Sequence, residues 1–280
     1  MPKTTSIVSL RNRKNCEAFG KTVAEHWIDR KPLPMLDPDL PMTNALIVRN
    51  TFLKHLESVV GRPAGYKVAA ITPPAQRDLG ICEPLGAIYL LGMFSSADSA
   101  KVSVTFGARP IVEAKMMAVV GDKAINDADS PQNAAKSISH LVPSLELGDS
   151  LAHRDQRIIG AILTVYNVGA RCVLTGPMIP FSIAVNDDVS GLEKMIVSTH
   201  DVGPTSKELE RHSASVMMGS PLNAIYWIVQ HHRAQGFIFK QGDRLGLGAL
   251  SRVRPTSGQT INTVWEGLLT KPIEVGVTFA

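Results

Sequence analysis

A carboxylate and an ammonium group are expected side by side on one strand of this sequence. The apolar run from Ile111 to Val120 is typical of a β-strand. Because successive side chains of a strand point to opposite faces, Glu113 and Lys115 fall on the same face. Such a pair can bind an anionic group and take part in proton transfer.

A second lysine and a second glutamate stand in apolar surroundings. Lys67 lies in the apolar segment 65–69, and Glu146 follows Leu145. Burial of Lys67 would favour the neutral amine, whereas nearby carboxylates would favour the ammonium ion, and these opposing effects suit an acid/base group. Arg109 either binds a substrate carboxylate through its two-pronged guanidinium or simply marks the start of a strand.

The cysteines and histidines suggest no further chemistry. The three cysteines are odd in number and lack CxxC spacing, so we predict neither a disulfide framework nor a thiolate zinc site. His231 and His232 are adjacent on a predicted helix and therefore point to different faces. Structural roles are expected for the histidines.

The composition is that of a globular protein. Its 280 residues, 44% apolar and 19% charged, can bury a full core in one large domain or one domain with a helical cap. The net charge of +4 is spread too thinly for a nucleic-acid partner but is compatible with small anionic substrates. No apolar stretch approaches the roughly 20 residues that cross a bilayer. We therefore expect a soluble, cytoplasmic protein without a membrane partner.

Helices are expected at the start of the chain and a β-rich core after them. Apolar residues recur at helical spacing in two segments, 16–27 and 46–59. Short apolar runs then predict strands at 66–70, 87–91, 102–106, 111–120, 171–174 and 273–279. A late helix should begin at Pro221, capped by Ser220, and end before Gly236. We predict a helical cap at residues 1–60 and one core at residues 61–280.

Four segments of the sequence carry a resemblance to a known family. They are Gly65-Tyr66-Lys67 with Gln76 and Leu79-Gly80; Val112-Glu113-Ala114; Leu145-Glu146 with Asp149-Ser150; and 219–224 followed by Gly242-Asp243. In order and spacing they resemble the fumarylacetoacetate hydrolase superfamily, in its 2-oxo-4-pentenoate hydratase and 4-oxalocrotonate decarboxylase branch. The resemblance runs from about residue 15 to the C-terminus.

The resemblance implies a fold, a metal site and an assembly. The fold would be α+β: a mixed β core, shaped as a roll or barrel, with flanking helices. In that family three carboxylates hold a divalent ion, usually magnesium or manganese, which chelates a 2-oxo acid and stabilises its enolate. Glu113 and Glu146 match two of those ligand positions, and Lys67 matches the family's lysine. Family members commonly form homo-oligomers.

The sequence departs from the family at the centre of that site. The family pattern Glu-x-Glu is replaced by Glu113 and Lys115, so a lysine stands where the middle ligand is expected. Pro84-Leu85-Gly86 lacks the family's acid, and Leu247-Gly248-Ala249 lacks its hydroxyl residues. We therefore predict no cofactor. If the family's metal site survives, Glu113 and Glu146 would hold Mg2+ or Mn2+.

Three hypotheses about function follow. The first is a lyase of the hydratase or decarboxylase type that acts on a small anionic 2-oxo acid, or its enol or dienol, through an enolate. The second is a metal-independent isomerase or cyclase in which Lys115 replaces the metal cation. The third is a non-catalytic partner subunit. The predicted site comprises Lys67, Glu113, Lys115 and Glu146, with Arg109 as a substrate-binding residue.

Overall fold

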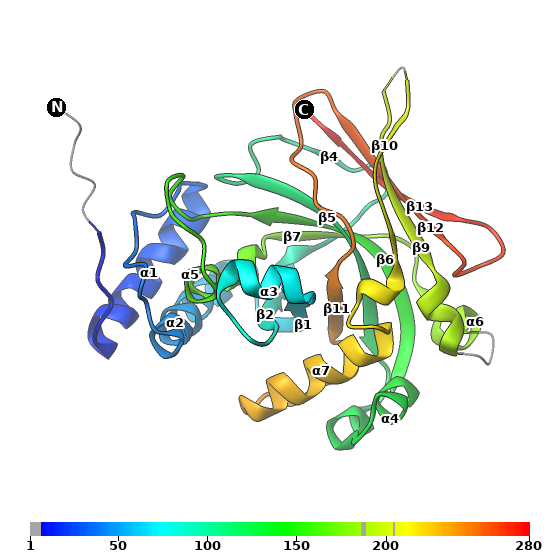
Figure 1. The fold of residues 1–280 in the computed structure, drawn as a ribbon, viewed down its shortest axis with the longest axis horizontal. Coiled ribbons are helices and arrows are strands. Elements are labelled where there is room, and N and C mark those ends of the chain that lie inside the picture. Colours follow the sequence, from blue (N-terminus) through cyan, green and yellow to red (C-terminus); the bar gives the residue numbers. More distant parts are fainter. Residues whose placement is uncertain (1–6, 186–188, 204) are drawn as a thin grey trace.

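The computed structural model describes residues 7–185, 189–203 and 205–280. The first helices of the chain lie at the left of Figure 1, later helices lie along the lower edge and at the right, and two sheets make up most of the rest. The α-helices are α1 (Arg13–Asp29), α2 (Met42–Val60), α3 (Pro73–Leu79), α4 (Pro131–Lys136), α5 (Gly160–Val165), α6 (Phe181–Val185) and α7 (Pro221–Ala234).

The larger sheet has eight strands and forms the centre of the molecule. Its strands lie in the order β2-β1-β11-β5-β6-β7-β3, with β8 paired to β6. They are β1 (Pro63–Ala69), β2 (Leu85–Leu90), β3 (Phe94–Ser96), β5 (Pro110–Val120), β6 (Ile138–Asp149), β7 (Cys172–Thr175), β8 (Ile179–Pro180) and β11 (Arg244–Ala249). The antiparallel pair β5 and β6 is its longest and lies near the middle of the sheet.

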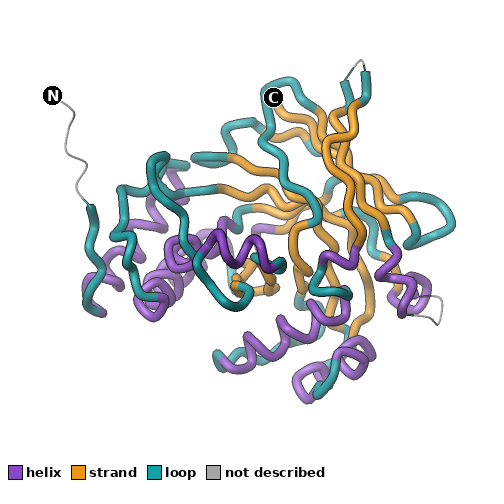
Figure 2. The backbone as a smooth tube through the Cα atoms, viewed as in Figure 1, coloured by secondary structure: helices purple, strands orange, loops and turns teal. Residues whose placement is uncertain are grey.

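The smaller sheet has five strands in the order β10-β9-β12-β13-β4 and lies at the right of Figure 2. Its strands are β4 (Lys101–Val102), β9 (Ile196–Asp201), β10 (Lys207–Ser213), β12 (Thr260–Glu266) and β13 (Ile273–Phe279). Buried and partly exposed residues alternate along β12, as expected for a strand with one covered face.

The helices cover the larger sheet and share its hydrophobic core. α7 packs against β1 and β11, and α2 packs against α1 and α5. Buried residues of α2 such as Phe52 and Leu53 belong to the same apolar cluster as Tyr66 and Val68 of β1. The division into a cap at residues 1–60 and a core at residues 61–280 stays a prediction.

The predicted α+β architecture is confirmed, with one strand misplaced. The larger sheet curls, and the helices flank it (Figure 1). α7 begins at Pro221 with the Ser220 hydroxyl as its cap, as predicted. The strand predicted at 102–106 ends at Val102, because the Ser103 side chain accepts a hydrogen bond from the backbone of Thr105 and folds the chain into a turn. Across the described residues, no helix is both long and apolar enough to span a membrane.

Candidate active site

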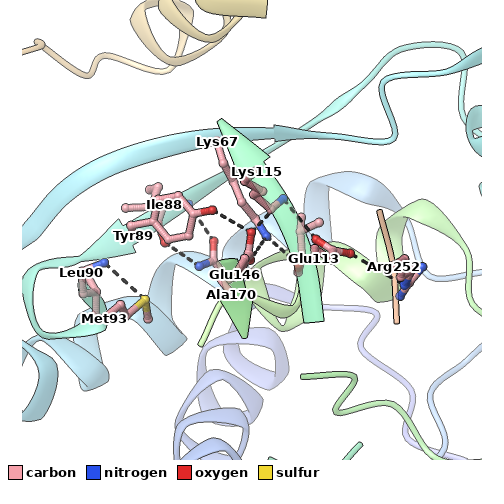
Figure 3. Close-up of polar contacts among 12 residues, drawn as sticks. Lys67, Ile88, Tyr89, Leu90, Met93, Glu113, Lys115, Glu146, Ala170 and Arg252 are labelled. Atoms are coloured by element: carbon pink, nitrogen blue, oxygen red, sulfur yellow. Dashed lines mark hydrogen bonds and ion pairs between the residues drawn. The ribbon is translucent and has the colours of Figure 1, made fainter. Parts of the chain in front are cut away.

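Three neighbouring strands bring two glutamates and two lysines together. β5 and β6 pair with Glu113 directly opposite Glu146, and Lys115 lies two residues further along β5. β1 contributes Lys67 and is separated from β5 only by β11. Figure 3 shows the four side chains pointing toward one another. Their predicted proximity is confirmed, while their catalytic role stays a prediction.

The Lys115 ammonium lies between the two carboxylates. Its Nζ atom is 3.1 Å from Glu113 Oε2 and 2.8 Å from Glu146 Oε2. Its side chain is only 1% exposed, whereas that of Glu113 is 17% exposed. Lys115 is therefore a buried cation with Glu113 on its more open side.

Glu146 accepts hydrogen bonds from three side chains. Lys67 Nζ donates to Glu146 Oε1 at 2.5 Å, and it also donates to the Val168 carbonyl at 3.0 Å. The Tyr89 hydroxyl donates to Glu146 Oε2 at 2.7 Å, so that this oxygen is shared with Lys115. Because a buried carboxylate is stable only when it is paired and hydrogen-bonded, these donors explain how Glu146 can be completely buried.

The surroundings shift the pKa values of the two lysines in opposite directions. Burial acts to lower the pKa of Lys115, but attraction to Glu146 and Glu113 raises it above its ordinary value. The pKa of Lys67 is lowered, because burial and repulsion from Lys115 outweigh attraction to Glu146. Lys115 is thus held as an ammonium ion, and Lys67 is the lysine that releases a proton more readily.

The carboxylate and the phenol beside these lysines keep fixed protonation states. Burial acts to raise the pKa of Glu146, but the two ammonium groups together lower it to about 2. Burial raises the pKa of Tyr89 well above its ordinary value, and the Glu146 charge adds to this effect. Near neutral pH, Glu146 is an anion and Tyr89 is a neutral donor.

A cavity of about 330 Å³ opens onto this cluster. Glu113, Glu146 and Arg252 line it, while Lys67 and Lys115 lie beneath the two carboxylates and do not. One wall is apolar and includes Leu79, Ile111, Ile158, Leu163 and Val168. The cavity therefore combines a charged floor with an apolar wall, as small-molecule sites usually do.

Arg252 lines the cavity, whereas Arg109 does not. The Arg109 guanidinium donates to the Ser150 hydroxyl at 2.8 Å and to its carbonyl at 3.3 Å, and Arg109 does not line the cavity. Arg252 Nε lies 3.7 Å from Glu113 Oε1, and its side chain is 64% exposed. The predicted substrate-binding role of Arg109 stays a prediction, and Arg252 is the arginine that lines the cavity.

Arg252 and Tyr89 were missed because long-range pairing positions them. An isolated bridge between Val112 and Val253 sets Arg252 beside Glu113, and no local motif signals it. Tyr89 reaches Glu146 because β2 pairs with β1. The available signal for Tyr89 was a single hydroxyl within an apolar, strand-like run.

Comparison with known proteins agrees with this fold. The chain is 23% identical over 225 residues to a 2-keto-4-pentenoate hydratase of Paraburkholderia xenovorans, covering 79% of each chain. The same values hold for 2-keto-4-pentenoate hydratase 3 of Pseudomonas putida. The structure of 4-oxalocrotonate decarboxylase from Pseudomonas putida G7, complexed with magnesium and adipate, superimposes with a TM-score of 0.80 at 15% identity. That match covers 96% of this chain and 98% of the decarboxylase.

By these matches the chain is similar, at low identity, to proteins of the hydratase and decarboxylase branch of the fumarylacetoacetate hydrolase superfamily, and it shares their fold. A more remote structural match is fumarylpyruvate hydrolase from Pseudomonas aeruginosa in complex with Mn2+ and pyruvate. It has a TM-score of 0.55 at 14% identity, over 78% of this chain and 90% of the hydrolase. No family model matches the chain.

The superfamily implies a divalent ion, but the donors in this chain do not fit one. A hard divalent cation needs several oxygen ligands that are free to coordinate it. Both oxygens of Glu146 already accept hydrogen bonds, and the Lys115 ammonium lies between Glu113 and Glu146. A second cation there would be repelled by Lys115. Within the described parts of the chain, no group of three His, Cys, Asp or Glu side chains is arranged to hold a metal.

Proposed function

We propose that this protein is a lyase of the hydratase or decarboxylase type that forms an enolate from a small anionic 2-oxo acid without a bound divalent ion. The observation that carries the proposal is the buried Lys115 ammonium between Glu113 and Glu146, beneath a cavity of substrate size. The relatives named as 2-keto-4-pentenoate hydratases support the substrate class.

Arg252 and Lys115 supply the positive charge for the substrate and its enolate. Arg252 lines the cavity with an exposed guanidinium, which can bind the substrate carboxylate through two parallel hydrogen bonds. Lys115 lies beneath the cavity floor and does not line the cavity, so it favours the negative charge that develops on the 2-oxygen through its electric field rather than by direct contact.

Glu113 is the group placed to remove a proton from carbon. Its carboxylate lines the cavity. The contact between Glu113 and Lys115 is longer than the contact between Glu146 and Lys115, at 3.1 Å against 2.8 Å. Glu146 is a poor base because three side chains donate to it and its pKa is about 2. A proton taken from C3 by Glu113 leaves its electron pair in the enolate, and Lys67, whose pKa is lowered, is the second proton-transfer group of the site.

Isomerisation or cyclisation is the second candidate, and the identity of the cation favours it. An ammonium ion donates hydrogen bonds but cannot chelate two substrate oxygens as a divalent ion does. Returning the C3 proton to another carbon of the same enolate needs no chelation and no added reactant. The lyase and the isomerase share the enolate and differ only in its fate.

Deuterium exchange at C3 tests the shared step. In D2O, the wild-type protein should catalyse exchange at C3 of pyruvate or 2-keto-4-pentenoate, followed by 1H NMR. Glu113→Gln should slow exchange by roughly 100-fold, the usual scale for a lost general base. Glu57→Gln, at an exposed site on α2, is the matched control. If neither compound exchanges its C3 protons, the result would favour a non-catalytic partner subunit.

A further inference from the structure

A second, positively charged cavity lies away from the candidate active site. It has a volume of about 270 Å³ and is lined by residues from three segments of the chain: Arg62 with Ala64, Leu91, and the stretch from Lys240 to Arg244. Arg62, Lys240 and Arg244 provide three cations, and Asp243 provides one carboxylate. The cavity therefore carries an excess of positive charge.

The three cations share the cavity with one carboxylate, Asp243, but form no salt bridge with it. Among the described residues none of them makes a salt bridge, and the Arg62 guanidinium donates only to the Pro63 carbonyl, at 3.1 Å. The Asp243 carboxylate accepts a hydrogen bond from the Lys240 backbone at 2.8 Å, so it holds a turn together. The cavity thus holds three cations and one carboxylate, which leaves a net positive charge.

Arg244 is held in place although no carboxylate binds it. Its guanidinium lies over the Phe94 ring, 4.2 Å from the ring centre. Phe94 packs edge-on against the buried Tyr89, which fixes the ring. Partial burial lowers the pKa of Arg244, because the charged guanidinium loses contact with water and has no carboxylate partner in the described part of the chain. An anion bound in the cavity would offset this cost of desolvation.

We propose that this cavity is a binding site for a small oxyanion with two or more negative charges. The guanidinium of Arg244 is already oriented by the Phe94 ring, and its N–H groups match the geometry of phosphate and carboxylate oxygens. The exposed side chains of Lys240 and Arg62 add positive charge to the cavity. Because these side chains are flexible, they can bind anions of different shapes. This site is independent of the proposed function, because it shares no lining residue with the cavity above Lys115.

Calorimetric titration with pyrophosphate and with citrate, at constant ionic strength, tests the proposal and separates phosphoryl from carboxylate ligands. The wild-type protein should bind at least one of them with a Kd below about 1 mM. Lys240→Ala and Arg244→Gln should each weaken binding by about 10-fold or more. Lys240 is exposed, so Lys240→Ala keeps the test valid if Arg244→Gln fails to fold.

Two control variants locate the bound anion. Arg233→Ala removes an exposed cation at the end of α7, and Arg252→Ala removes the cation of the candidate active site. Both should bind the anion as the wild type does. The proposal is overturned if neither anion binds, if the controls lose affinity as much as the cavity variants, or if Lys240→Ala changes the oligomeric state and not the affinity.

Discussion

The two buried lysines of the candidate site differ in their electrostatic surroundings. Lys115 contacts two carboxylates, and this contact raises its pKa, whereas Lys67 contacts one and has a lowered pKa. A lasting positive charge and a transferable proton are thus assigned to different residues. This division of roles is common where acid/base chemistry runs at neutral pH.

Lys67→Met should lower both activity and stability. We expect exchange at C3 to slow by roughly 100-fold, because the acid/base lysine is lost. We also expect the free energy of unfolding to fall by about 3 kcal/mol, because a buried partner of Glu146 is removed. NMR exchange and urea denaturation measure the two effects.

Lys54→Met, at an exposed position of α2, is the control for this substitution and should change neither quantity. A Lys67→Met protein with full exchange activity would remove Lys67 from the mechanism.

At the scale of the elements, α7 carries a histidine that should make the fold sensitive to acid. His232 is completely buried, and neither ring nitrogen has a hydrogen-bond partner in the described part of the chain. It packs against Tyr66 and Phe237, and the nearby charged or titratable groups are Arg49 of α2 and His231 of α7. Burial, aided by His231 and Arg49, lowers the pKa of His232 to about 3.

His232→Phe should reduce the loss of stability in acid. Below about pH 6.5 the unfolded chain binds a proton at His232 that the folded chain does not, so stability falls as the pH drops. The expected loss from this residue is about 2 kcal/mol at pH 5 relative to pH 7. Urea denaturation at both pH values should show a smaller loss for His232→Phe than for the wild type. The prediction is wrong if His232→Phe and the wild type lose the same free energy of unfolding between pH 7 and pH 5. It is also wrong if His55→Phe, at an exposed position, reduces this loss as much as His232→Phe does.

The sequence predicted elements best where local signals were strong. α7 has a hydroxyl cap, a proline at its first position and a glycine just after it, so its bounds could be read directly. β6 was not predicted, because Pro143 interrupts its apolar run and polar residues such as Ser144 and Glu146 are buried within it. The Glu113–Lys115 contact followed from strand periodicity, whereas the proximity of Lys67 and Glu146, which lie far apart in the sequence, followed only from the family resemblance.

At the scale of the whole molecule, the family resemblance predicts a homo-oligomer. β10 forms one edge of the smaller sheet and carries alternating charges, including Lys207, Glu208 and Arg211, which disfavour strand pairing with a second copy. Other surfaces should therefore make the contact. Light scattering at micromolar concentration should give a mass that is a multiple of the 30.2 kDa chain, and a monomer would contradict the prediction.

In the proposed function, the Lys115 ammonium provides the positive charge that a divalent ion would otherwise provide at the site. The most direct measurement is the rate of C3 exchange, with chelator and with added Mg2+ or Mn2+, for the wild type and for Lys115→Glu. We expect wild-type exchange to be insensitive to both additions, and exchange by Lys115→Glu to require the metal, because three carboxylates would then surround the site. If the wild type instead purifies with one divalent ion bound by Glu113 and Glu146, and chelators abolish its exchange activity, the claim is wrong.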